Sequence, residues 1–289
     1  MNAASRAGCY SHDPCLFQKR IFTPMADAEV MKQTRFENPF RSIGCAECRN
    51  PEVLGFEFTM AFQPIVDLTT RSIFAYEALV RGPGAESAAS VLAKVNDHNR
   101  YRFDQACRIR AIELASRLRL QDIGNCKLSI NFLPNAVYRP ETCIRATLEA
   151  AQQFCFPMDR LMFEVTEVER IDDPSHLNRI FEEYSRRGFT TAIDDFGAGY
   201  SGLNLLASFQ PHIIKLDMAL TRNIDADVVR QAIVAGIIQV AVRLNIEVIA
   251  EGIETPAERD ALMALGVRYM QGYLYARPAF EQLVEPTFS

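Results

Sequence analysis

Two adjacent carboxylates, Asp194 and Asp195, follow a short apolar run and precede a glycine-rich loop. Neighbouring acids repel each other, so a fold that holds both at the end of a strand needs a compensating cation. A divalent metal ion with hard oxygen ligands is the first candidate. The alternative for either acid is a structural role, because an aspartate after a strand commonly caps the next helix.

The loop that follows allows a third interpretation. Residues 197–202 have the spacing G-x-G-x-x-G, and Asp217 lies about 20 residues further on, as in a dinucleotide-binding loop. Without a metal, however, the two acids in front of this loop would repel a pyrophosphate. The remaining polar residues of the chain have to decide between these interpretations.

Strand-like segments alternate with helical patterns from about residue 56 onward. The predicted strands are 58–68, 71–80, 127–132, 161–166, a central strand ending at Asp194, 212–216, 246–250 and 267–271. The predicted helices are 88–98, 101–119, 140–151, 174–187, 202–208, 225–243 and 256–265. This alternation indicates an α/β fold with a largely parallel sheet. The number of strands and the length suit a (β/α)8 barrel whose first two strands form a hairpin.

Six of these strands lead into an oxygen ligand or a lysine. The residues are Glu77, Asn131, Glu164, Asp194 with Asp195, Lys215 and Glu251. In a barrel the carboxyl ends of the parallel strands form one rim, so we expect these side chains to converge at one mouth. Helix capping could explain one or two of them, but it cannot explain the lysine.

Five carboxylates and one amide are enough ligands for two hard cations with a shared bridge. The absence of histidine and cysteine from this set favours Mg²⁺ or Mn²⁺ over zinc. Two such ions about 3.5–4 Å apart typically support in-line hydrolysis of phosphate esters. Lys215 could orient the attacking water or stabilise charge. The strand ends therefore predict a two-metal phosphoesterase.

Composition narrows the possible partners. A net charge of −5 over 289 residues gives no basic footprint for duplex nucleic acid. The most apolar stretch, residues 228–242, is interrupted by polar residues, so we expect a buried or interface helix there and no membrane span. The cysteines at positions 107, 126, 143 and 155 lie in apolar segments and are predicted to be reduced thiols. These features predict a cytoplasmic protein.

Residues 1–55 lack sustained periodicity and form a predicted loop-rich N-terminal extension, whereas 56–285 form the catalytic domain. The extension contains Cys9, Cys15 and the C-x-x-C pair Cys45 and Cys48, but no second C-x-x-C or histidine pair completes a metal pattern. The role of the extension and of its cysteines is not predicted. A protein partner could bind there.

With these residues laid out, the chain resembles the EAL-domain cyclic di-GMP phosphodiesterases. The name-giving triplet is Glu77-Ala78-Leu79. The other shared segments are F-Q-P-I-V at 62–66, S-I-N-F at 129–132, E-V-T-E at 164–167, D-D-F-G-A-G-Y-S at 194–201, K-L-D at 215–217, E-G-I-E at 251–254 and Q-G-Y at 271–273. The resemblance covers about residues 56–282.

The resemblance implies a modified TIM barrel with an antiparallel first strand. It also implies hydrolysis of cyclic di-GMP to linear pGpG, two Mg²⁺ or Mn²⁺ ions and a homodimer. One ion would bind Glu77, Asn131, Glu164 and Asp194, and the other Asp194, Asp195 and Glu251. Lys215, Glu77 and Glu251 would be catalytic, with Lys215 contacting the attacking water. Glu167 would support the loop 196–201, and the implied substrate contacts are Gln63, Leu79, Arg81, Asp217, Glu254 and Gln271.

Two further functions remain alternatives. A degenerate domain of this kind could be a catalytically silent cyclic di-GMP receptor or a protein-interaction module, although no metal ligand or lysine is missing here. An unrelated metal-dependent barrel enzyme of the enolase type would explain the acids but not the nucleotide-contact motifs.

Overall fold

The computed structural model describes residues 54–166, 174–199 and 202–288. Strands β1 (Thr59–Asp67) and β2 (Ser72–Arg81) form an antiparallel hairpin in which Gln63 pairs with Glu77. The following strands are parallel to β2 and to one another: β3 (Lys127–Asn131), β4 (Leu161–Thr166), β5 (Thr190–Phe196), β6 (Ile213–Leu216), β7 (Glu247–Ala250) and β8 (Tyr269–Met270).

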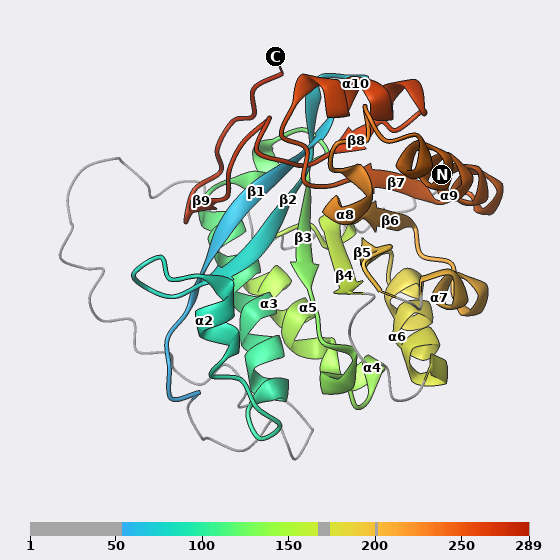
Figure 1. Cartoon of the computed structure of the whole chain (residues 1–289). Coiled ribbons are helices and arrows are strands. Elements are labelled where there is room, and N and C mark those ends of the chain that lie inside the picture. Colours follow the sequence, from blue (N-terminus) through green and yellow to red (C-terminus); the bar gives the residue numbers. More distant parts are fainter. Residues whose placement is uncertain (1–53, 167–173, 200–201, 289) are drawn as a thin grey trace, which may run out of the picture. The chain divides into compact units, whose positions relative to one another are not determined.

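Strand β1 closes the sheet into a barrel, because it pairs with β2 on one edge and with β8 on the other, antiparallel to both. The short strand β9 (Ala279–Phe280) pairs with the first half of β1 (Figure 1). The prediction of a modified (β/α)8 barrel with an antiparallel first strand is therefore confirmed.

Helices follow most of the strands and pack on the outside of the barrel (Figure 1). They are α2 (Ala88–Leu92), α3 (Arg100–Arg117), α4 (Pro140–Cys143), α5 (Arg145–Gln153), α6 (Pro174–Arg186), α7 (Gly202–Ser208), α8 (Met218–Thr221), α9 (Val228–Leu244) and α10 (Pro256–Ala264). Three short 3-10 turns cover Leu120–Asp122, Pro134–Ala136 and Met158–Arg160. None of the helices in the described ranges combines the length and the apolarity that a membrane span needs.

Several helix boundaries differ from the prediction for local reasons. The helix expected at 88–98 ends at Leu92, because the side chains of Asn96 and Asn99 then bind backbone N–H groups and stabilise a turn. The helix expected at 140–151 is split at Ile144 into α4 and α5. Helix α9 begins three residues later than expected, because the Asp227 side chain accepts hydrogen bonds from the N–H groups of Val229 and Arg230 and so caps the helix.

Of the cysteines in the described residues, Cys107, Cys126 and Cys143 are buried free thiols, as predicted. Cys155 is disulfide-bonded, so the prediction of a reduced thiol is wrong at this position. The predicted extension, with Cys9, Cys15, Cys45 and Cys48, lies outside the described residues except for its last two positions.

Candidate active site

An apolar layer inside the barrel lies directly below the predicted site. It contains Ile65, Ala75, Met162, Ala192, Ile213, Ile249 and Tyr269, one residue from each of seven strands. Because strand side chains alternate between the two faces, the residues two positions further on also point inward. On the parallel strands these are Glu77, Glu164, Asp194, Lys215, Glu251 and Gln271. The polar layer therefore forms the next level, at the carboxyl ends of the strands.

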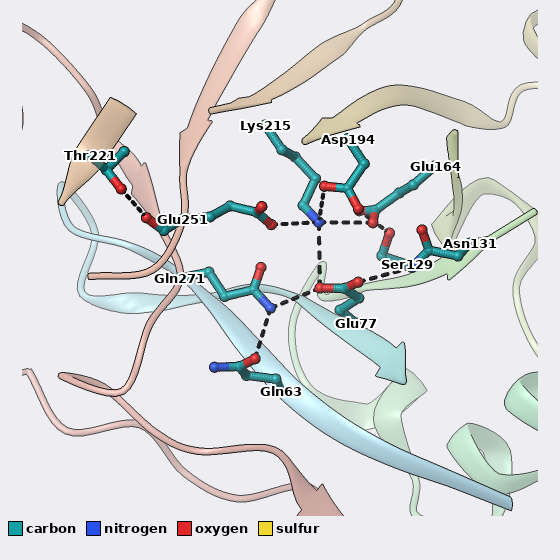
Figure 2. Close-up of polar contacts among 10 residues, drawn as sticks. All are labelled: Gln63, Glu77, Ser129, Asn131, Glu164, Asp194, Lys215, Thr221, Glu251 and Gln271. Carbon is teal, nitrogen blue, oxygen red and sulfur yellow. Dashed lines mark hydrogen bonds and ion pairs between the residues drawn. The ribbon is translucent and has the colours of Figure 1, made fainter. Parts of the chain in front are cut away.

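Lys215 lies at the centre of this polar layer, where four carboxylates surround it (Figure 2). Its Nζ is 2.6 Å from Glu251 Oε1, 2.9 Å from Glu164 Oε2 and 2.9 Å from Asp194 Oδ1. Glu77 Oε2 is 3.4 Å away. The lysine is fully buried, so this one ammonium is the local counter-charge for a group of acids that water does not screen.

Uncharged residues orient two of these acids. Asn131 Nδ2 donates to Glu77 Oε1 at 2.9 Å, and Gln271 Nε2 donates to Glu77 Oε2 at 2.8 Å. The Ser129 hydroxyl donates to the Glu164 carboxylate. Ser129 is a site residue that the sequence reading did not select, although it precedes Asn131 by two positions and so shares its face of the strand.

A β-bulge in β5 explains how two consecutive aspartates can face one site. Ile193 pairs with Ile214 and Phe196 with Leu216, so β5 contains one more residue than β6 between these two pairs. Asp195 has φ 54°, in the left-handed region that few residues other than glycine adopt. In a regular strand Asp195 would point away from Asp194, whereas here carboxylate oxygens of both residues and of Glu251 lie within 4.8 Å of one another.

The same oxygens fit a hard divalent cation. Glu77, Glu164 and Asp194 form one group with ligand atoms within 4.8 Å of one another, and Asp194, Asp195 and Glu251 form a second. Asp194 belongs to both groups. The set offers only oxygen donors, which suits Mg²⁺, Mn²⁺ or Ca²⁺.

The electrostatics of Glu77 and Lys215 favour their charged forms. Burial disfavours ionisation of Glu77, but Lys215 and the hydrogen bonds from Gln271 and Asn131 outweigh it and lower its pKa. Burial likewise disfavours the charged lysine, yet Asp194 and the other surrounding carboxylates raise the pKa of Lys215 well above its ordinary value. Lys215 therefore remains an ammonium and does not act as a proton acceptor.

The other acids hold protons more tightly. Burial, together with the charges of Glu77 and Asp194, raises the pKa of Glu164 to about 8 against the effect of Lys215. Burial and the adjacent Asp194 raise the pKa of Asp195 to about 6. Burial and Asp194 also raise the pKa of Glu251. One lysine is thus insufficient to keep all five carboxyls ionised, so the site favours additional positive charge.

Helix α8, which the sequence reading missed, connects the loops around this layer. The Thr221 hydroxyl donates to the backbone carbonyl of Glu251 at 2.5 Å (Figure 2). A Cβ at Gly252 would lie 2.6 Å from Met218 Cβ, and one at Gly197 would lie 2.4 Å from a Leu220 methyl carbon. Both glycines have positive φ, so glycine is needed for conformation as well as for space.

The predicted substrate residues lie in two groups. Gln63, Leu79, Arg81 and Gln271 adjoin the acids: Gln271 Nε2 is 3.3 Å from Gln63 Oε1, and the other two follow Glu77 along the same face of β2. The backbone directly after Gln271 packs against the backbone of Ile253: a Cβ at Gly272 would lie 2.0 Å from the Ile253 carbonyl oxygen. This close contact restricts the position of Gln271.

The other two predicted contacts have structural partners nearer the surface. Asp217 caps α8 by accepting from the Ala219 N–H at 2.8 Å. Glu254 is exposed and forms an ion pair with Arg222 at 2.9 Å. Glu167 lies outside the described residues.

A family model for the EAL domain matches residues 52–278. The chain belongs to the EAL domain family. Among curated relatives, the blue light- and temperature-regulated antirepressor BluF of Escherichia coli is 33% identical over 75% of this chain and 53% of its own length. The cyclic di-GMP phosphodiesterase RocR of Pseudomonas aeruginosa is 32% identical over 58% of this chain and 43% of its own. The chain thus spans about half or less of these relatives.

Solved structures agree with this assignment. A standalone EAL protein from Vibrio cholerae O395, crystallised with bound c-di-GMP, is 57% identical with a TM-score of 0.78 and covers 81% of this chain and 98% of its own. Klebsiella pneumoniae BlrP1, in a manganese and cyclic di-GMP complex, is 35% identical with a TM-score of 0.74 over 81% of this chain and 59% of its own.

Proposed function

We propose that this protein is a phosphodiesterase that hydrolyses cyclic di-GMP to linear pGpG with the aid of two Mg²⁺ or Mn²⁺ ions. The observation that supports this most strongly is the pair of carboxylate groups sharing Asp194 around a buried lysine. Relatives named as cyclic di-GMP phosphodiesterases, and the manganese and cyclic di-GMP complex of BlrP1, support the substrate and the metal class.

In this proposal the chain's own residues hold and orient the reactants. Glu77, Asn131, Glu164 and Asp194 would hold one ion, and Asp194, Asp195 and Glu251 the other. When bound, such ions lower the pKa of water and stabilise the developing negative charge. Lys215, kept charged by its neighbours, would orient the attacking water and balance charge at the phosphate. The bulge at Asp195 would supply the ligand that the second ion requires.

Substrate recognition would take place on the side of the mouth formed by β1, β2 and the segment after β8. Gln63 and Gln271 are buried, and Arg81 on β2 is the natural partner for a phosphate oxygen. Leu79 would contact the nucleotide. We place Asp217 and Glu254 at the guanine side, and Glu167 as support of the loop 196–201.

The test is incubation of the purified protein with cyclic di-GMP and Mn²⁺ or Mg²⁺, with chromatographic separation of the products. We expect conversion to pGpG in the wild type and at least about a 100-fold loss of activity in Glu77→Gln, because the variant loses a charged metal ligand. Glu182→Gln, an exposed position on α6, is the matched control and should retain full activity. Binding of cyclic di-GMP without turnover would favour the receptor alternative, and neither binding nor turnover would refute the proposal.

We also propose that the protein forms a homodimer through α9. Val229, Ile233 and Val240 are exposed and, with Gly236, form an apolar stripe at helical spacing. Only two charged residues, Arg230 and Arg243, occur in this helix, so a second copy of the same face would meet little like-charge repulsion. Light scattering should give a dimer for the wild type and a monomer for Ile233→Glu. A monomeric wild type would refute this assignment.

A further inference from the structure

Arg108, on α3, has the largest fully buried side chain in the described part of the chain. Its Nη2 is 2.7 Å from Asp104 Oδ2, and its Nη1 donates to the Tyr184 hydroxyl on α6 at 2.6 Å. The exposed fractions of the Arg108 and Asp104 side chains are 0% and 1%. This pair lies outside the barrel, between its wall and the helices, and belongs to no part of the site described above.

The guanidinium packs against the outer faces of the two strands that bear Asn131 and Glu164. Arg108 Cζ is 5.4 Å from the ring centroid of Phe132 and 5.5 Å from that of Phe163. Phe132 follows Asn131 directly, and Phe163 directly precedes Glu164. Neighbouring side chains in a strand point to opposite faces. Phe132 and Phe163 therefore face outward and contact Arg108, while Asn131 and Glu164 beside them face the site.

Asp104 fixes the backbone that leaves β3. Its Oδ1 accepts a hydrogen bond from the Leu133 N–H at 2.9 Å. One residue earlier, the Phe132 N–H donates to the Glu164 carbonyl at 2.9 Å. The backbone just after Asn131 is therefore attached both to helix α3 and to strand β4, which fixes the backbone position from which the Asn131 side chain extends.

Stability alone does not explain this pair. Burial raises the pKa of Asp104 against the effect of Arg108, whereas Asp104 and Tyr184 outweigh burial and keep Arg108 charged. Removing two opposite charges from water is unfavourable, and replacing a buried ion pair by apolar side chains of similar volume is often neutral or stabilising. Apolar side chains could not, however, accept the hydrogen bond that the Leu133 N–H donates to Asp104.

We infer that Asp104 and Arg108 are positioning residues that hold Asn131 and Glu164 in the geometry required for cation binding. This inference rests on the proposed metal site. It assigns a role to residues that touch neither the metal nor the substrate, and it predicts that cation affinity and fold stability respond differently when the pair is removed.

The test compares the wild type with Asp104→Leu/Arg108→Met, which removes both charges at similar volume. We expect an unchanged or higher Tm, a Kd for Mn²⁺ that calorimetry shows to be about 10–100-fold weaker, and faster amide hydrogen exchange at residues 131–133 of the metal-free protein. Asp104→Asn/Arg108→Met keeps an acceptor for the Leu133 N–H, so its Kd should lie between the two. If the first variant does not fold, the Mn²⁺ Kd of this second variant tests the inference instead.

The matched control is Asp67→Leu/Arg268→Met, which removes an ion pair at the opposite ends of the strands. It should leave the Kd for Mn²⁺ unchanged whatever its effect on Tm. Wild-type Mn²⁺ affinity, or unchanged exchange at residues 131–133, in the folded apolar double variant would overturn the inference. If the wild type itself bound no Mn²⁺, the proposed function would fail, while the exchange measurement would still decide whether the pair orders this segment.

Discussion

Replacing Lys215 by methionine removes the ammonium group at the centre of the polar layer. At an effective dielectric constant of about 20, a charge pair 2.9 Å apart interacts by roughly 6 kcal/mol, and Lys215 makes two contacts of this length and a shorter one. Part of this loss is recovered because the acids take up protons. We therefore expect the metal-free variant to lose about 3 kcal/mol at pH 8, the usual cost of breaking a buried pair.

For a domain of this size, about 3 kcal/mol corresponds to a Tm lower by about 6–12 °C. The loss should shrink at pH 6, since Glu164, with its pKa near 8, is then protonated and the layer bears less negative charge. Saturating Mn²⁺ should stabilise the variant more than the wild type, because bound cations replace the missing ammonium.

Thermal melts by circular dichroism, in EDTA and in Mn²⁺ at both pH values, measure all three effects. The control is Lys127→Met, at the start of β3, where Nζ donates a long hydrogen bond of 3.4 Å to the Asp159 carbonyl. Its Tm should change by less than about 2 °C, in line with an isolated surface substitution. A Lys215→Met shift as small as that of the control, or one independent of pH, would refute the electrostatic reasoning.

Three more predictions concern groups around and away from this lysine. Ser129→Ala leaves the buried Glu164 carboxylate without its hydroxyl donor, so Mn²⁺ affinity in a calorimetric titration should fall about 10-fold. Mn²⁺ binding should release protons and strengthen between pH 6 and 8, because Glu164 and Asp195 must ionise to bind the metal. Calorimetry in two buffers of different ionisation enthalpy would measure the proton release, and equal heats in both buffers would contradict it. Asp67→Asn should lower the free energy of unfolding in urea by about 1 kcal/mol above pH 4, a value kept small because the partner Arg268 is exposed. The difference should vanish as the pH falls towards 2, since the ion pair lowers the pKa of Asp67 to about 2.

The barrel and its polar mouth could be predicted because both depend on short-range patterns. Alternating strands and helices indicate a parallel sheet, and parallel strands deliver their last residues to the same edge. The same two-residue period could also have identified Ser129, two positions before Asn131. The short turn between the first two strands indicated a hairpin, whereas the modified barrel with an antiparallel first strand was implied by the family resemblance.

The features that could not be predicted depend on contacts distant in sequence or on a single unusual residue. Periodicity places Asp194 and Asp195 on opposite faces, and only the bulge, with one left-handed residue, brings both to the site. Arg108 is one of five arginines on α3 and the only one of them that is buried, so its complete burial was not visible in the sequence. Helix α8 and strand β9 are too short to have a period.

The layered interior explains how the fold tolerates so much negative charge at one point. If every acid of the site were ionised, the four carboxylates of the polar layer and the adjacent Asp195 would face one ammonium. The raised pKa values of Glu164 and Glu251 indicate that the metal-free protein opposes this state. The apolar layer below excludes water from the acids and fixes the strands that bear them. Tight burial therefore makes Glu164 and Glu251 poorer acids and, at the same time, better ligands for any cation that enters. Metal affinity and pH-dependent stability are two consequences of the same arrangement, so a variant within the polar layer should alter both. Loss of the Asp104 and Arg108 pair, which acts from behind the barrel wall, should instead weaken metal binding without lowering the Tm.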